Sequence, residues 1–342
     1  MTNKSNPIIT GVLSYGMSGR VFHTPFIDQN ERFELRGVVE RTKKTVHLEY
    51  PTTKSYDSVD AIIADEEIEF IIVNTPNDTH VDFAKQALLA GKHVLIEKPF
   101  APTVAEAQEL FDLGQQVGKQ VLPFHNRRFD SDFLSLKHIL DKGFVGKPIE
   151  LHLRFDRYTP YLSHKIFKET KNRAGSGVLY DLGSHLLDQT ISLFGKPRSM
   201  TKIQSQNREK STVDDYATLI LTYDGGLNVF ITASLLVANP QQSIVLHGTK
   251  GSFVKERTDI QEKQLLAGMK PLAPGYGLEE PGSEGLLTIM EGEVRKDINV
   301  VANKGEYMLL FDAVYQAIRH NEPYFVSPEE ILWQLDILSG KR

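Results

Sequence analysis

The pattern of apolar and polar positions divides the chain into two parts. Through about the first 125 residues, short apolar runs alternate with amphipathic stretches, which predicts alternating strands and helices and hence a parallel sheet. Strands are expected at residues 8–14, 33–40, 69–75, 93–97 and 120–124. The clearest helices between them are expected at residues 80–90 and 103–117.

The second part of the chain begins after a helix expected at residues 129–142. Longer runs of alternating apolar and polar residues predict an antiparallel sheet, with strands at 149–154, 200–206, 215–223, 227–234 and 243–248. Asp224, Gly225 and Gly226 separate two of these runs and predict a hairpin. Helices are expected at 182–193, 306–319 and 328–338. Residues 255–284 are expected to form surface loops, and no final strand is expected at the end of the chain.

Together the patterns of the two parts predict an α/β protein of two domains. Residues 1–126 are expected to form a domain with a parallel sheet, and residues 127–342 an α+β domain on a mainly antiparallel sheet. A chain of 342 residues is long enough for each domain to bury a core of its own.

Composition excludes several classes of function. The 39 basic and 44 acidic residues give a net charge of -5, so no excess of positive charge favours nucleic acid or an anionic membrane. Because the chain has no Cys, it has no disulfide, no thiolate metal site and no thiol nucleophile. The polar N-terminus lacks the pattern of a signal peptide, and no apolar run is long enough to span a bilayer. We therefore expect a cytoplasmic protein.

The turn after the first expected strand is a candidate dinucleotide site, formed by Ser14, Gly16, Met17, Ser18 and Gly19. Gly16 and Gly19 occupy the second and third glycine positions of the fingerprint G-x-G-x-x-G, and Ser14 replaces the first. Such a turn brings backbone N–H groups and a helix N-terminus against a pyrophosphate. An ordinary glycine-containing turn is the alternative, but its place after the opening strand favours the dinucleotide.

The end of the second expected strand bears on the choice between NAD and NADP. Glu40 stands near the spacing at which an acid binds the adenosine ribose hydroxyls, which favours NAD. Arg41, Lys43 and Lys44 follow at once, and an arginine fork suits the 2′-phosphate of NADP. A solvated charged face is the third interpretation, so the sequence leaves the preference open.

Two further groups of residues follow later strands or share a helix. Lys98 comes directly after a buried strand and before a proline, where it is expected to be partly desolvated near the cofactor; a surface lysine in a turn is the alternative. Asp181, His185 and Asp188 are spaced to lie on one face of a helix, which predicts a proton-transfer pair of His185 and a carboxylate. A capping Asp beside a buried His is the alternative. No further ligands cluster with a metal-site spacing, so no metal is expected.

Two longer phrases join these features. Residues 16–26 and 125–130, together with the Glu97-Lys98-Pro99 run and the Asp181 and His185 pair, resemble the Gfo/Idh/MocA family of oxidoreductases over most of the chain. The phrases are similar to the branch that contains bacterial scyllo-inositol dehydrogenases. The resemblance implies an N-terminal Rossmann domain for NAD or NADP and a C-terminal α/β domain whose large open sheet mediates oligomer contacts. It also implies that the substrate lies between the two domains.

The resemblance also implies roles for single residues. Lys98 would contact the reacting oxygen and His185 would act as the general acid/base, with Asp181 beside it. The loops on the nicotinamide side would include Thr75, Pro76, Asn77, His80 and Glu97. The residues near the ribose or substrate would include Asn126, Arg157, Tyr158 and Asp188.

The activity so implied is that of an NAD(P)-dependent dehydrogenase acting on a CH–OH group of a cyclic polyol or sugar such as an inositol. A homo-oligomer, dimer or tetramer, is expected from the family. Two alternatives stay open. One is a sugar hydrolase or lyase that uses NAD without net redox change, and the other is a nucleotide-sensing regulatory protein, although such a sensor needs no acid/base pair.

Overall fold

The computed structural model describes residues 6–162, 169 and 175–340. Two compact units divide the chain. The first takes in Met1–Asn126, Glu262–Tyr276 and Tyr307–Leu332, and the second Arg127–Gln261, Gly277–Glu306 and Trp333–Arg342, as far as these ranges are described. That the chain forms two domains with a boundary after residue 126 stays a prediction. Of the helices described, none is long and apolar enough to cross a membrane.

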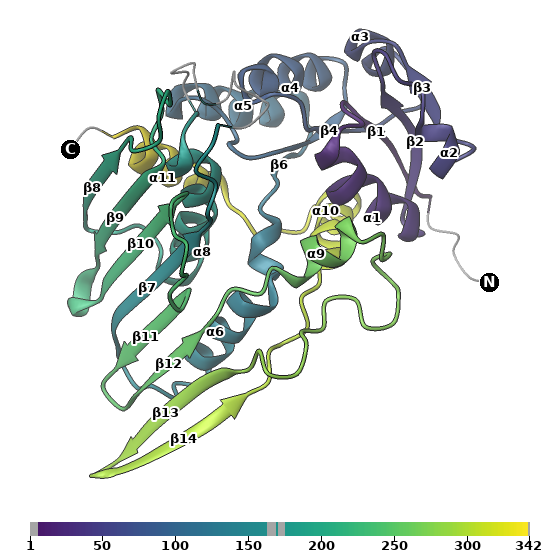
Figure 1. Ribbon diagram of the computed structural model, residues 1–342. Coiled ribbons are helices and arrows are strands. Elements are labelled where there is room, and N and C mark those ends of the chain that lie inside the picture. The colour runs from purple at the N-terminus through teal and green to yellow at the C-terminus, as the bar shows by residue number, and fades with distance from the viewer. Residues whose placement is uncertain (1–5, 163–168, 170–174, 341–342) are drawn as a thin grey trace. The chain divides into compact units, whose positions relative to one another are not determined.

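The first unit is built on a six-stranded parallel sheet with the strand order β3-β2-β1-β4-β5-β6 (Figure 1). The strands are β1 (Ile8–Val12), β2 (Phe33–Val39), β3 (Lys54–Tyr56), β4 (Phe70–Val73), β5 (His93–Ile96) and β6 (Val121–Pro123). Five of them lie within the predicted ranges, and β3 was not predicted. The chain runs outward from β1 to β3 and returns to β4 beside β1. This reversal is the switch point at which doubly wound sheets bind ligands.

Helices follow the strands, as predicted. The helices are α1 (Thr24–Gln29), α2 (Val46–Glu49), α3 (Val59–Ile63), α4 (His80–Leu89), α5 (Val104–Val117) and α10 (Met308–His320), with a π-helical turn η1 (Gly19–His23) and a 3₁₀ turn η2 (Asn77–Thr79). Crossovers that leave β1 in opposite directions place their helices on opposite faces of the sheet. Phe26 of α1 stacks on Phe311 of α10 with ring centroids 5.2 Å apart, so a helix from late in the chain completes the layer beside α1.

The second unit is built on an eight-stranded sheet with the order β14-β13-β12-β11-β7-β10-β9-β8 (Figure 1). Its strands are β7 (Pro148–Asp156), β8 (Ser199–Ser205), β9 (Tyr216–Thr222), β10 (Asn228–Ser234), β11 (Ile244–Gly248), β12 (Gly251–Lys255), β13 (Gly285–Glu291) and β14 (Val294–Val300). All neighbours pair antiparallel except β7 and β10. The mainly antiparallel sheet and the β9–β10 hairpin at Gly225 are therefore confirmed.

Alternation along these strands produces one buried face. Leu151 and Leu153 of β7 and Val229 and Ile231 of β10 are buried in the core of the unit. Two helices, α6 (Ser131–Asp141) and α8 (Ser184–Phe194), pack against this sheet. The remaining turns and helices are η3 (Asn126–Phe129), the π-helical η4 (Leu179–Gly183), η5 (Asp224–Gly226), α9 (Ile260–Leu266) and α11 (Pro328–Ser339). The predicted helices at 129–142, 182–193, 306–319 and 328–338 are thus present.

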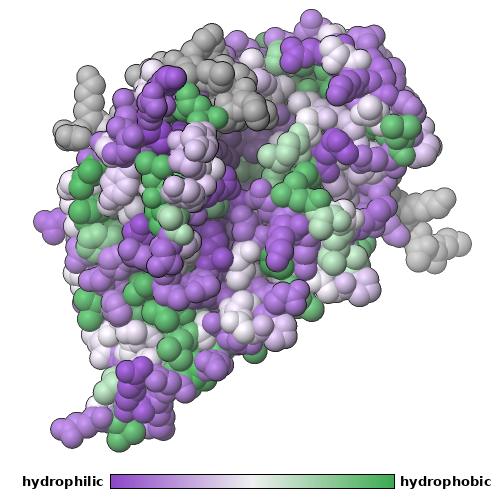
Figure 2. All heavy atoms as spheres, in the orientation of Figure 1, coloured by the Kyte–Doolittle hydropathy of each residue, from purple (hydrophilic) through white to green (hydrophobic). Residues whose placement is uncertain are grey.

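Two expectations about the second half were incomplete. Residues 255–284 are not only loops, because α9 lies within them. The sheet is completed by β12, β13 and β14, none of which was predicted. The β13–β14 hairpin alternates too weakly to be predicted, because β14 is exposed on both faces for nearly its whole length. Figure 2 shows hydrophobic residues among hydrophilic ones on this hairpin, where Met290 and Val294 are exposed.

Candidate functional site

The predicted glycine turn lies at the carboxyl end of β1, beside the end of β4. Asn74, which follows β4, donates a hydrogen bond of 2.8 Å from Nδ2 to the carbonyl oxygen of Ser14. Its other polar atom, Oδ1, is buried and has no hydrogen-bond partner in the part of the chain that the structure describes. A buried acceptor at the switch point is suited to receive a hydrogen bond from a ligand.

The two glycines of the turn are required for different reasons. A Cβ at Gly19 would overlap the carbonyl oxygen of Ser14, so the protein's own packing demands glycine there. A Cβ at Gly16 would have one described neighbour within 4 Å, the Ser14 hydroxyl at 3.4 Å. Space above Gly16 and the helical turn η1 directly after it fit the pyrophosphate of a dinucleotide. Met17 is exposed on the same turn.

Glu40 is fully occupied by the protein itself. Its Oε1 accepts hydrogen bonds from the Thr45 backbone N–H (2.8 Å) and the Thr45 hydroxyl (3.0 Å). Its Oε2 accepts from the Val46 N–H (3.3 Å) and the Ser55 hydroxyl (2.8 Å). A carboxylate offers about four acceptor positions, and here all four are filled. Glu40 therefore caps the start of α2 and joins it to β3.

The electrostatics of Glu40 agree with this structural role. Burial raises its pKa, but the hydrogen bonds from Thr45, Ser55 and Val46 outweigh burial and lower the pKa below its usual value. The next residue, Arg41, is exposed, as are Lys43 and Lys44. Which of Glu40 and Arg41 faces the ribose stays a prediction.

The loop between β4 and α4 holds Thr75, Pro76 and Asn77, and it ends at His80. His80 is only 1% exposed. Its Nε2 lies 2.9 Å from the carbonyl oxygen of Thr75, and its Nδ1 lies 3.0 Å from that of Pro99. Burial lowers the pKa of His80 more than these two hydrogen bonds raise it. The side chain thus braces the loops that follow β4 and β5, and its direct contact with a cofactor stays a prediction.

Glu97 and Lys98 follow β5. Glu97 Oε1 lies 2.9 Å from Nε2 of His23 and accepts a hydrogen bond of 2.6 Å from the Ser18 hydroxyl. Burial raises the pKa of Glu97, but His23, the Ser18 hydroxyl and the charge of Lys98 together lower it to about 2. The carboxylate is therefore ionised at neutral pH. Lys98 is half-buried, and its backbone N–H donates to Glu97 Oε2 at 3.3 Å.

In the second unit, the predicted acid/base residues lie at the junction of η4 and α8. Asp181 is exposed on η4, and His185 is buried near the start of α8. The prediction assumed one continuous α-helix, whereas a π turn carries i→i+5 hydrogen bonds and changes the spacing of side chains. The expected common face of Asp181 and His185 therefore rests on the wrong helix type, and their pairing stays a prediction.

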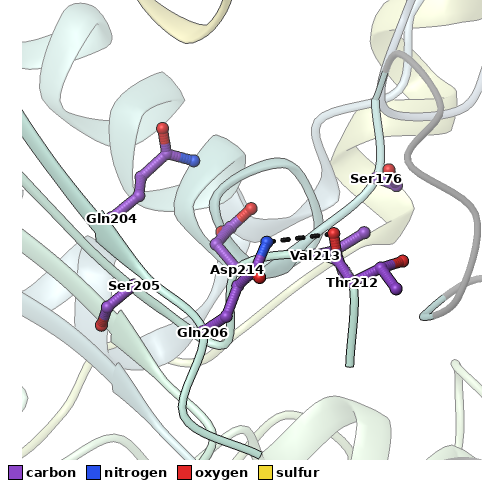
Figure 3. A pocket seen from close by; sticks show the side chains of 7 residues that line it. All are labelled: Ser176, Gln204, Ser205, Gln206, Thr212, Val213 and Asp214. Carbon is purple, nitrogen blue, oxygen red and sulfur yellow. Dashed lines mark hydrogen bonds between the residues drawn. The ribbon is translucent and has the colours of Figure 1, made fainter. Parts of the chain in front are cut away.

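Another acid, Asp214, fixes the start of η4. Asp214 Oδ2 accepts a hydrogen bond of 2.8 Å from the Leu179 N–H. Burial raises the pKa of Asp214 more than this N–H lowers it. Gly177 has φ +93°, and a Cβ there would overlap the Asp214 carboxylate. A cavity of about 530 Å³ opens here, lined by Ser176, Gln204, Ser205, Gln206, Thr212, Val213 and Asp214 (Figure 3).

Asp188, predicted to bind substrate, is 2% exposed and held inside the second unit. Its two carboxylate oxygens accept hydrogen bonds of 2.9 and 2.7 Å from Nε and an Nη of Arg128. Oδ1 also accepts from Gln334 at 2.8 Å. A bidentate arginine pair of this kind is strong and orienting. The geometry favours a structural role for Asp188, and substrate contact stays a prediction.

The other residues expected near the substrate differ in exposure. Asn126 is buried at the end of the first unit's long segment. Arg157 and Tyr158 are exposed at the end of β7, with the Arg157 guanidinium 5.1 Å from the ring centroid of Phe155. Part of the segment that follows lies outside the described residues.

Sequence reasoning did not single out four residues that hold these sites together. They are His23, Arg128, Asp214 and Gln334. His23 and Arg128 lie inside the two phrases that carried the family resemblance, but nothing local marks their partners, which are 74 and 60 positions away. Only tertiary contacts reveal such roles.

Comparison with known proteins extends the sequence resemblance. Residues 8–125 match the model "Oxidoreductase family, NAD-binding Rossmann fold", and residues 133–254 match "GFO/IDH/MocA C-terminal domain". The uncharacterized oxidoreductase C115.03 of Schizosaccharomyces pombe is 36% identical over 331 residues, covering 91% of this chain and 90% of that protein. The chain belongs to the Gfo/Idh/MocA oxidoreductase family.

Two further matches, one to a curated protein and one to a solved structure, are both from Bacillus subtilis. The protein named scyllo-inositol 2-dehydrogenase (NADP(+)) IolW is 32% identical over 328 residues, covering 96% of this chain and 90% of that one. The solved structure of the putative oxidoreductase yvaA is similar with a TM-score of 0.93 at 31% identity, covering 98% and 95%. The protein is accordingly an NAD(P)-binding oxidoreductase with a Rossmann-type first unit, as the sequence predicted.

Proposed function

We propose that the protein is an NADP-dependent dehydrogenase that oxidises a secondary alcohol of a cyclic polyol or sugar, or reduces the corresponding ketone. The observation that carries the proposal is a half-buried lysine, Lys98, at the carboxyl end of β5. Its neighbour Glu97 accepts a hydrogen bond from Ser18 of the glycine turn that fits a pyrophosphate. A relative named scyllo-inositol 2-dehydrogenase supports an inositol-like substrate.

Three side chains carry the chemistry in this proposal. The nicotinamide, when bound, accepts or donates the hydride. His185 takes the proton of the substrate hydroxyl in the oxidation and returns it in the reduction. The ammonium of Lys98 stabilises the negative charge that develops on the same oxygen. Asp181 orients the imidazole, and Arg157 and Tyr158 contact hydroxyl groups away from the reacting carbon.

The test is the absorbance of reduced nicotinamide during incubation with inositols and simple sugars. Lys98→Met and His185→Ala are each expected to lower kcat by about 10²-fold or more, with dinucleotide affinity nearly unchanged. Unaltered turnover in both variants would contradict the proposed mechanism. Product release without stoichiometric NADPH would favour the non-redox hydrolase or lyase, and binding without any turnover would favour the sensor.

The preference for NADP follows from Glu40 and Arg41. A carboxylate whose four acceptor positions are filled has none left for ribose hydroxyls. The exposed Arg41 and Lys43 leave positive charge beside the end of β2, where it suits a 2′-phosphate. In fluorescence titrations, Arg41→Ala should weaken NADPH binding by about 10-fold and NADH binding little. If only Glu40→Gln weakened NADH binding, Glu40 would be the residue that binds the ribose hydroxyls.

We also propose that the protein is a homo-oligomer assembled through the second sheet. The strand register aligns one row across it, with Ile220, Phe230, His152 and Val245 on the side away from the buried core. Phe230 and His152 stack with ring centroids 4.6 Å apart and are half-buried. Such a face needs burial. Phe230→Asp should lower the mass measured by light scattering, whereas the control Leu48→Asp on α2 should not.

A further inference from the structure

Residues 97–99 form the short turn that presents Lys98. Each end of this turn contacts a different buried histidine. On the far flank, His80 contacts the Pro99 carbonyl oxygen at 3.0 Å. On the near flank, His23 contacts the Glu97 carboxylate at 2.9 Å. The two contacts differ in kind, because His80 contacts the backbone and His23 contacts a charged side chain. Lys98 itself lies between the two anchored positions.

His23 is buried among aromatic rings of the first unit. It is 0% exposed, and its ring lies 4.5 Å from that of Phe124 and 6.4 Å from that of Phe311. Because the Glu97 carboxylate is ionised and can only accept, Nε2 of His23 is the donor. In the described part of the chain, Nδ1 has no hydrogen-bond partner. The whole polar function of His23 is therefore directed at Glu97.

Glu97 also reaches the dinucleotide turn. The oxygen that accepts from His23 accepts from the Ser18 hydroxyl, and Ser18 is the residue before Gly19. The second oxygen faces the Lys98 N–H. One carboxylate thus joins the Lys98 turn to His23 of η1 and to Ser18 of the glycine turn, which lie 74 and 79 positions before Glu97 in the chain.

We propose that His23 is a positioning residue for Lys98, acting through Glu97, and that the Ser18 contact couples occupancy of the dinucleotide turn to the placement of the lysine. This rests on the proposed function, in which Lys98 stabilises the alkoxide. A carboxylate released from His23 would swing or take up water, and the lysine turn would lose one of its two anchors. Small misplacements of a catalytic group lower the rate with little effect on substrate binding.

The first arm of the test is steady-state kinetics with inositol or the best sugar found. His23→Leu should lower kcat by about 10- to 100-fold with substrate KM little changed. His23→Gln, whose Nε2 can reach Glu97, should recover most of kcat, whereas the shorter His23→Asn should not. His93→Leu is the matched control. His93 begins β5, the strand that Glu97 follows, and it accepts a hydrogen bond from the Gln120 N–H at 2.9 Å. It should lose stability while kcat is kept.

The second arm needs no substrate. Lysines are reductively methylated with ¹³C-formaldehyde and a borane reductant, and the Lys98 signal is assigned by its loss in Lys98→Arg. His23→Asn should shift or broaden this signal, and His23→Gln should leave it near the wild-type position. Addition of NADPH should move the signal in the wild type and move it less in Ser18→Ala. This arm decides the proposal even if no tested alcohol is oxidised, which would count against the proposed function alone.

Two results would overturn the proposal. One is a loss of kcat in His23→Leu or His23→Asn no greater than in His93→Leu. The other is a Lys98 signal that neither the His23 variants nor NADPH in the wild type affects. If His23→Leu does not fold, the comparison of His23→Gln with His23→Asn carries both arms, since the two differ by one methylene.

Discussion

Glu40 and Glu97 each stand directly after a strand of the same parallel sheet, and sequence reasoning assigned both to the dinucleotide. In the structure both carboxylates are occupied by protein groups, but by different kinds of partner. Glu40 receives only neutral donors, all within 15 positions of it in the chain. Glu97 receives an imidazole and a hydroxyl from 74 and 79 positions away.

This difference separates a local cap from a junction. Glu40 satisfies backbone N–H groups that would otherwise lack partners at the start of a helix, which is a stabilising role confined to α2 and β3. Glu97 connects the turn that fits a pyrophosphate to the lysine of the proposed mechanism. An acid after a strand of a nucleotide-binding sheet is therefore not by itself a ligand contact. Its unoccupied acceptor positions have to be counted first.

The largest expected effect is on turnover. Glu97→Gln removes the charge that His23 and Lys98 face, and we expect kcat to fall by about 10²-fold. Glu40→Gln removes an equal charge from the same sheet edge, and we expect kcat to change less than about 3-fold. Steady-state assays at saturating NADPH or NADP measure both. Equal losses in the two variants would contradict the distinction between cap and junction.

The next effect is on stability in acid. The pKa of Glu97 falls from the usual 4.5 to about 2 on folding, so the folded state binds fewer protons between these values. The resulting stabilisation is complete above pH 4.5 and is lost as pH falls toward 2, amounting to roughly 3 kcal/mol. Denaturant unfolding from neutral pH downward should show a shallower acid limb in Glu97→Gln than in the wild type.

The control for that experiment is Glu109→Gln, which removes one exposed carboxylate from α5. An acid limb in Glu97→Gln that is as steep as in this control would mean that the His23 contact does not hold the carboxylate ionised in solution.

The smallest effect concerns the cap. Glu40→Ala should lower the free energy of unfolding by about 1–2 kcal/mol, because it leaves N–H and hydroxyl groups of the α2 start without an acceptor. Ser58, whose side chain accepts from the Ala61 N–H at the start of α3, provides the comparison, and Ser58→Ala should cost about 1 kcal/mol. NADPH affinity should be unchanged in both. Weaker NADPH binding in Glu40→Ala alone would show that the carboxylate also serves the cofactor.

Five of the six strands of the first sheet were predictable because they are short apolar runs bounded by turns. Residues 70–73 are fully buried on both faces and are apolar throughout. The β13–β14 hairpin was not predictable, because β14 is exposed on both faces and has no alternation to detect. The helix predicted at 182–193 is present, but the π turn at 179–183 that leads into it was not predicted, because a π turn has the composition of any helix.

The sequence by itself determined the fold class, because periodicity is a local property of the chain, and its resemblance to a known family supplied the family and most of the candidate residues. The tertiary structure decided which contacts those residues make. It filled the acceptor positions of Glu40, tied Asp188 to Arg128, and brought His23 and Ser18 to Glu97. A carboxylate's role depends on the donors within about 3 Å of it, and donors that lie 60 or more positions away in the chain are set by packing rather than by any local pattern.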